Sequence, residues 1–86
     1  MAIIYVTDNK HRADLKVYKE ERSKLSADMH YYETDNKYNA KKDCIWYFTD
    51  NKHRADKQVF WEKNKHSADI KVYKVDSKYH AKGSFE

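Results

Sequence analysis

Short apolar runs recur along the chain, and each is followed by a polar stretch. Six runs of three or four β-branched and aromatic residues, bounded by polar side chains, are typical of strands. Apolar and charged side chains alternate with a period of two in segments such as 15–17 and 70–72, which favours half-buried strands over helices. The predicted strands cover residues 3–6, 15–18, 29–32, 45–48, 59–61 and 70–73.

The polar stretches share one motif, Asn/Ser-Lys-x-x-Ala, which occurs six times. Its alanines are Ala13, Ala27, Ala40, Ala55, Ala68 and Ala81. The octapeptide TDNKHRAD is identical at 7–14 and 49–56, and the order of motif variants repeats after three copies. We interpret the chain as a single domain, residues 1–86, made by tandem duplication of a three-unit module. The two pseudo-symmetric halves are residues 4–44 and 45–86.

An aspartate precedes the motif in four copies and favours a one-turn helix there, because a carboxylate at the N-cap accepts free N–H groups. The predicted caps are Asp8, Asp35, Asp50 and Asp76. The connections are too short for a full crossover helix, and they favour parallel or crossing strands over a simple meander. We therefore predict an α+β fold, mainly β, in which six short strands alternate with one-turn helices.

The repeated units resemble a known family. Tyr-x-(Val/Thr)-Asp-(Asn/Ser)-Lys, followed by Ala-Asp and Lys-Val-Tyr, is similar to a small family in which the chain forms a septafoil, a seven-crossing torus knot. The stretches that carry this resemblance are Tyr5 to Tyr18, Tyr32 to Ala40, Tyr47 to Phe60, and Ala68 to Ala81. The resemblance covers nearly all of residues 4–82. It implies a compact, knotted monomer. It supplies no functional residue, because that family has no established activity.

The composition indicates which compartment and which kinds of partner to expect. The 86 residues carry eight Tyr, 37% charged residues and a net charge of +4, a balance that permits weak attraction to polyanions without establishing it. The single cysteine, Cys44, excludes an internal disulfide and favours a reducing compartment, so we expect a cytoplasmic protein. We interpret Cys44 as a small core hydrophobe. The longest apolar run, 44–48, is far below the ~20 residues of a membrane helix, so no membrane partner is expected.

Catalytic motifs are missing from the sequence, which has no Gly-rich phosphate loop, nucleophile elbow or EF-hand loop. The acidic residues repeat with the module, which favours an architectural role. His11, His53 and His66 share the slot two residues before the motif alanine, where the other copies have Leu or Tyr. We interpret that slot as a packing position and not as a source of zinc ligands. The prediction is no enzyme, no catalytic residue, no cofactor and no metal.

The motif cations are the candidate binding residues. They are Lys10, Arg12, Lys24, Lys37, Lys52, Arg54, Lys65 and Lys78. A basic row is the electrostatic footprint of phosphate binding, and neighbouring Tyr and His could stack on bases. The alternative is that each lysine packs its stem over the aromatic core and keeps its ammonium in water. The predicted function is therefore a highly stable structural or interaction module, and its alternative is weak, sequence-tolerant nucleic-acid binding through these cations.

Overall fold

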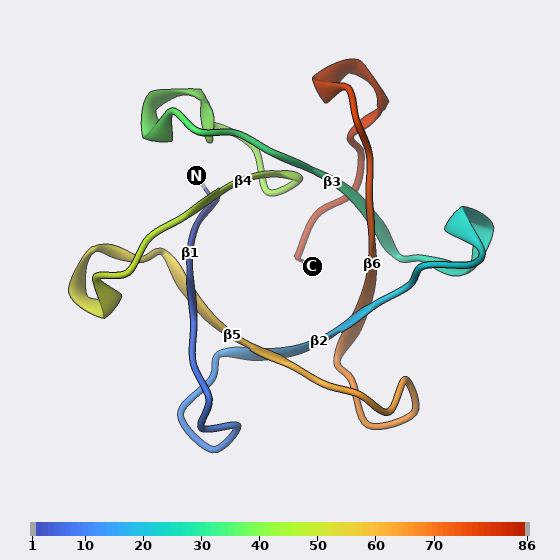
Figure 1. Ribbon diagram of the computed structural model, residues 1–86, viewed down its shortest axis with the longest axis horizontal. Coiled ribbons are helices and arrows are strands. Elements are labelled where there is room, and N and C mark those ends of the chain that lie inside the picture. Colours follow the sequence, from blue (N-terminus) through green and yellow to red (C-terminus); the bar gives the residue numbers. More distant parts are fainter. Residues whose placement is uncertain (1, 86) are drawn as a thin grey trace.

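The computed structural model describes residues 2–85, in which six parallel strands close into a barrel (Figure 1). The strands are β1 (Ala2–Val6), β2 (Leu15–Lys19), β3 (Met29–Glu33), β4 (Ile45–Phe48), β5 (Lys57–Trp61) and β6 (Ile70–Lys74). All six lie on the segments that the alternating pattern predicts, so those strand positions are confirmed. Every neighbouring pair of strands is parallel, so the prediction of parallel or crossing strands in place of a simple meander is also confirmed.

The predicted α+β class is wrong, because this barrel is an all-β fold. The helical structure of residues 2–85 consists of four isolated 3₁₀ turns of three residues each. They are η1 (Lys24–Ser26), η2 (Lys37–Asn39), η3 (Lys52–Arg54) and η4 (Lys78–His80). Each turn is closed by an i→i+3 bond, such as Arg54 N–H to the Asn51 carbonyl at 3.1 Å. After η1, η3 and η4 the next residue is extended (Ala27, Ala55 and Ala81), so these turns do not continue into an α-helix.

The predicted aspartate caps are also wrong, because the Asn or Ser after each aspartate is the cap. Asn51 has an extended backbone, and its side chain accepts the His53 N–H at 3.0 Å. Thr49, two residues earlier, accepts the Asn51 N–H at 3.1 Å, so Thr-x-Asn forms two consecutive side-chain turns. The aspartate between them is exposed and one residue too early to cap. This holds for Asp8, Asp35, Asp50 and Asp76.

The order of strands around the barrel is β1-β4-β3-β6-β2-β5. Strands from residues 4–44 therefore alternate with strands from residues 45–86, and every strand pair joins one half to the other. The two predicted halves are interleaved and do not form separate lobes. Four of the five connections pass over one intervening strand, whereas the β3–β4 connection joins neighbours.

An aspartate fastens each of the four long connections. Asp14, just before β2, donates its backbone N–H to the Gln58 carbonyl at 2.7 Å and accepts the Gln58 N–H on its carboxylate at 2.8 Å. Gln58 lies in β5, the strand over which the β1–β2 connection passes. We call this two-bond contact an aspartate clip. The other clips join Asp28 to Lys71, Asp56 to Ile3, and Asp69 to Lys16.

Inward side chains fill the barrel in layers. The central layer is at most 2% exposed at every position and consists of Ile4, Val17, Tyr31, Trp46, Val59 and Val72. Tyr31 stacks on Trp46 with ring centroids 4.2 Å apart. The outward position that follows each of these residues is always a half-buried aromatic ring: Tyr5, Tyr18, Tyr32, Tyr47, Phe60 and Tyr73. Rings therefore cover the outer surface of the barrel wall, whereas the central inner layer combines two rings with four aliphatic side chains.

The C-terminal tail closes the end of the barrel at which the strands begin. Lys82 and His30 exchange two backbone hydrogen bonds of 2.8 and 2.9 Å. Gly83 follows with φ of 110°, and a Cβ there would lie 3.0 Å from the Met29 Cα, so the position requires glycine. Phe85 then stacks on Trp46 at 5.9 Å, which places the tail inside the ring (Figure 1).

Candidate functional site: the loop rim and the barrel mouth

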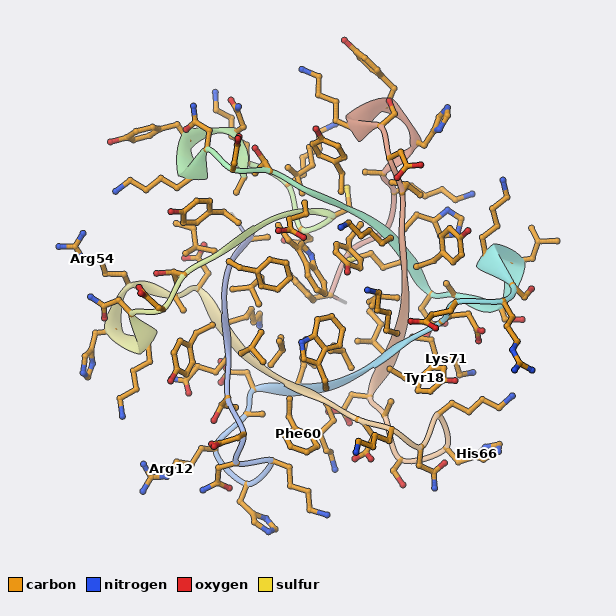
Figure 2. The ribbon with its side chains drawn as sticks, viewed as in Figure 1. Arg12, Tyr18, Arg54, Phe60, His66 and Lys71 are labelled. Carbon is orange, nitrogen blue, oxygen red and sulfur yellow. The ribbon has the colours of Figure 1, made fainter. Side chains whose placement is uncertain are left out.

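The five connecting loops and the loop that follows β6 radiate outward from the barrel and form the edge of a flat molecule (Figure 1). Its principal extents are 33 × 31 × 19 Å. The loop tips carry all eight predicted cations, and every one is exposed: Lys10, Arg12, Lys24, Lys37, Lys52, Arg54, Lys65 and Lys78. Arg12 and Arg54 point away from the barrel in Figure 2. We call this ring of loop tips the rim. The cations are therefore distributed around the circumference and do not share one flat face.

Two of the tip lysines contact rings of their own loops and not the aromatic core. The Lys37 ammonium lies 5.4 Å from the centroid of the next ring, Tyr38, and the Lys78 ammonium lies 5.5 Å from that of Tyr79. Both rings belong to the lysine's own loop, and they are 70% and 85% exposed. The alternative in which lysine stems cover the barrel wall therefore does not describe these two loops.

The residue after each tip lysine is exposed, so the packing role predicted for this slot is wrong. Leu25 is 90% exposed, the histidines of the slot are also exposed, and His66 points outward in Figure 2. The slot lies at the tip of a loop that extends away from the barrel (Figure 1). Each tip thus presents a lysine and its neighbour, which we call a tip pair. The tip pairs are Lys10–His11, Lys24–Leu25, Lys37–Tyr38, Lys52–His53, Lys65–His66 and Lys78–Tyr79.

Two reactive side chains lie inside the structure instead. His30 is 8% exposed, and its Nε2 donates to the Lys24 carbonyl at 2.8 Å, which ties the η1 loop to β3. Cys44 is 4% exposed and belongs to the core cluster, as predicted for a small hydrophobe. Across residues 2–85, no group of three His, Cys, Asp or Glu side chains is placed to hold a metal ion.

Sequence reasoning missed the open end of the barrel, where the strands finish. A depression of about 1040 Å³ lies there. It is lined by the last inward residue of each strand, and we call this ring the mouth: Val6, Lys19, Glu33, Phe48, Trp61 and Lys74. The alternating pattern that locates the strands also predicts these residues once it is extended by one more inward position. Ligand sites commonly occupy this end of parallel barrels.

The mouth has an apolar side and a charged side. Strands β5, β1 and β4 are consecutive in the barrel and contribute Trp61, Val6 and Phe48. Strands β3, β6 and β2 are consecutive as well and contribute only charged residues at this level. The Trp61 and Phe48 ring centroids are 6.5 Å apart across β1. An amphipathic ring of this kind could contact both ends of a small molecule.

Below the mouth, Tyr31 lines the same depression. Its side chain is 2% exposed, and burial together with the charge of Glu33 raises the pKa of the Tyr31 hydroxyl to about 12. Burial is the larger cause, because a phenolate in the barrel interior would lose its hydration. The hydroxyl is therefore neutral at physiological pH and able to donate a hydrogen bond.

The interleaved strands and the six repeated loops form a distinctive architecture. A comparison with known protein families shows to which family the chain belongs. The sequence matches the family of 7(1) septoil knot domains over residues 1–83. The chain belongs to the septoil knot family. The septafoil resemblance in the sequence is thereby confirmed, and the knotted, strand-repeat character of that family extends to this chain. No curated protein and no solved structure matches it.

This septoil knot domain has two candidate surfaces, the rim and the mouth, and its described helical turns are far too short to cross a bilayer. The rim carries the residues that sequence reasoning selected. The mouth carries residues that only the barrel brings together, because they are spread over all six strands.

Proposed function

We propose that this septoil knot domain is a non-enzymatic interaction module of high kinetic stability that contacts its partners through the rim. The observation that supports this is the set of six tip pairs, each exposed and each held at the end of a hydrogen-bonded loop. Caps and aspartate clips fix the base of a loop, as Asn51 and Asp56 do for the η3 loop. Such loops lose little conformational entropy when a partner binds.

A second candidate function is weak, sequence-tolerant binding of single-stranded nucleic acid. A lysine beside an exposed ring matches what such strands contact, because the cation meets a phosphate and the ring stacks on a base. Five of the six tip pairs include a His or Tyr ring. The loops of η2 and η4 are neighbours in Figure 1, and a groove of about 560 Å³ lies between them. Three lysines and two tyrosines line that groove, and two aspartates offset part of the positive charge: Lys41, Lys42, Lys78, Tyr32, Tyr79, Asp35 and Asp76.

The absence of enzymatic activity, the monomeric state and a cytoplasmic location belong to the same proposal. The aspartates that recur in the repeats bond to the backbone in the clips, which supports an architectural role for the carboxylates. The buried free thiol of Cys44 suits a reducing compartment. Size-exclusion chromatography with light scattering tests the monomer, and a stable dimer at low micromolar concentration would contradict it.

Stability is tested by trypsin under native conditions. The rim offers exposed lysines, but cleavage requires a loop to open, and the clips oppose opening. We expect the intact chain to persist for hours, whereas the same chain in denaturant should be digested within minutes. Rapid native digestion to fragments would contradict the proposed kinetic stability.

Nucleic-acid binding is tested by fluorescence anisotropy with labelled single-stranded and duplex DNA and RNA. A single strand that meets three lysines should lose on the order of 20-fold in affinity between ~50 and ~200 mM salt. The triple variant Lys10→Glu, Lys37→Glu, Lys52→Glu should abolish binding. The matched control is Lys19→Glu, Lys63→Glu, Lys82→Glu, which has the same net charge but an intact rim. Equal loss in both variants, or no binding at either salt, would exclude the rim as a nucleic-acid surface.

A further inference from the structure

The residue type at the mouth position differs between the six strands, whereas the two preceding positions of each strand keep the same residue character. The position one residue earlier in each strand is always aromatic, and the position before that is always buried and hydrophobic. Positions that serve the fold therefore recur in all six copies. The mouth position instead contains valine, phenylalanine, tryptophan, glutamate and two lysines. A layer that the fold leaves free to vary is available for a specific ligand.

The variation at the mouth is ordered. The aromatic and aliphatic members lie on one side of the barrel, over β5, β1 and β4. Val6 is 39% exposed, so this side keeps apolar surface open to solvent. Trp61 and Phe48 are both partly buried against Trp46, at centroid distances of 6.4 and 5.9 Å. Their rings are therefore supported from below and can receive a flat apolar group from above.

The charged side has one excess cation. The Lys74 ammonium and the Glu33 carboxylate form an ion pair of 3.5 Å, with both side chains 46% exposed. Lys19 lies on the strand next to Lys74 and, within residues 2–85, makes no ion pair. Lys19 belongs to β2, the strand between that of Lys74 and that of Trp61, and it lines the depression with both.

Further charges border the depression from the loops. The Glu62 carboxylate accepts the backbone N–H groups of Lys63 and Asn64, at 3.1 and 3.4 Å, which holds it in its own loop but leaves its negative charge in place. Glu21, Asp50 and Lys63 are exposed residues beyond the ends of the strands. Solvent and salt screen these loop charges. On the inward positions themselves, Glu33 and Lys74 pair with each other, so the unpaired charge there is that of Lys19.

We propose that the mouth binds a small amphipathic carboxylate, with an aromatic or other flat apolar body against Trp61 and Phe48 and the carboxylate on the Lys19 ammonium. One negative charge matches the single excess cation, and ring contacts favour a planar body. The depression of about 1040 Å³ is large enough for such a molecule. This site is separate from the rim and does not depend on the proposed function.

The test uses three ligands of nearly the same shape: 3-phenylpropionate, 3-phenylpropanamide and 3-phenylpropylamine. Binding is followed by two-dimensional NMR of the ¹⁵N-labelled protein at ~150 mM salt. The Trp61 indole N–H should shift on titration. The Trp46 indole N–H should shift little, because it is 0% exposed and donates to the Asp43 carbonyl. We expect the carboxylate to bind at least tenfold more tightly than the amide, and the amine to bind more weakly still.

Variants separate the mouth from other surfaces. Lys19→Gln should reduce affinity for 3-phenylpropionate to that of the amide, whereas Lys19→Arg should retain most of it. Lys42→Gln, away from the mouth, is the matched control and should bind normally. The rim variant Lys10→Glu, Lys37→Glu, Lys52→Glu should also bind normally, so failure of the rim proposal and failure of this one are distinguishable.

Three results would overturn the inference: equal affinity for carboxylate and amide, tighter binding of the amine, or shifts confined to the loop tips. Unchanged affinity in Lys19→Gln would do so as well. Each variant's backbone spectrum shows whether it is folded, and Lys19→Arg keeps the test valid if the glutamine variant is not.

Discussion

At the scale of single residues, an aspartate in the polar loop bonds each long connection to the strand that it crosses. Asp14, Asp28, Asp56 and Asp69 each make two bonds to one residue of the strand that their connection crosses. The third copy has Lys41 in this position, and its connection crosses no strand. In these connections, an aspartate after the motif alanine accompanies a connection that crosses one strand, and the lysine accompanies the connection that crosses none.

Removing one clip should destabilise the fold modestly. Asp14→Ala leaves the Gln58 N–H without its carboxylate, and we expect the free energy of unfolding to fall by ~1 kcal/mol. Asp14→Asn keeps an acceptor and should cost less than half as much. Equilibrium urea unfolding, followed by tryptophan fluorescence, measures both. Asp8→Ala is the control, because Asp8 caps nothing and should change stability by less than ~0.5 kcal/mol. A larger loss at Asp8 than at Asp14 would contradict this assignment.

Tyr31 should make stability depend on alkaline pH. Its pKa in the folded protein is about 12, above the ordinary value of 10.0, so folding favours the protonated phenol. The resulting stabilisation is complete below pH 10 and is lost as the pH rises from 10 to 12, by on the order of 2–3 kcal/mol. Tyr31→Phe should lack this component. Unfolding free energies of both proteins at several pH values between 8 and 12 measure it, and parallel pH curves would show that Tyr31 does not contribute.

At the scale of elements, strands were predictable and their connections were only partly so. Alternation is local, and it locates β2 and β6 within one residue. The caps were misassigned because Asp50 and Asn51 are adjacent and both are good capping residues, and only the backbone angles of Asn51 show which is used. The mouth was missed because Lys19, Glu33 and Lys74 look like ordinary exposed strand ends until the barrel brings them together.

The tail is an element that the periodic pattern does not reveal, because it follows the last repeat. Gly83→Ala should destabilise the protein by ~1–3 kcal/mol, since φ of 110° strains an L residue and the new Cβ would meet the Met29 backbone. Thermal unfolding measures the effect. Lys82→Ala is the matched control, because that side chain is exposed and its role is carried by the backbone. Equal melting temperatures for both variants would show that the tail does not seal the barrel.

At the scale of the whole molecule, alternation of the two halves governs cooperativity. No described strand pairs with a strand of its own half, so local hydrogen bonding cannot stabilise either half alone. Pairing of this kind is non-local, and folding should be slow for a chain of 86 residues. The strand order could not be predicted from sequence, since six similar strands allow many closed arrangements and the selecting contacts, such as Asp69 to Lys16, lie far apart in sequence.

Separated halves should therefore be unfolded. Peptides of residues 1–44 and 45–86 should each lack near-ultraviolet circular dichroism, because Trp46 would lose Tyr31 and each barrel strand would lose both neighbours. Urea unfolding of the intact chain should show one transition by both tryptophan fluorescence and far-ultraviolet circular dichroism. A folded half, or two separate transitions, would contradict the interleaved architecture.

Because the strand order places each strand beside its duplicate, a side chain and its twin occupy neighbouring parts of one core. Trp46 lies on the strand next to its twin Ile4, and Tyr31 lies on the strand next to its twin Val72. In both pairs one member is large and the other is small. A change of volume in one copy can therefore be offset by its twin on the adjacent strand, because the two side chains share one part of the core. We expect substitutions in the core of such a repeat to be compensated within these pairs.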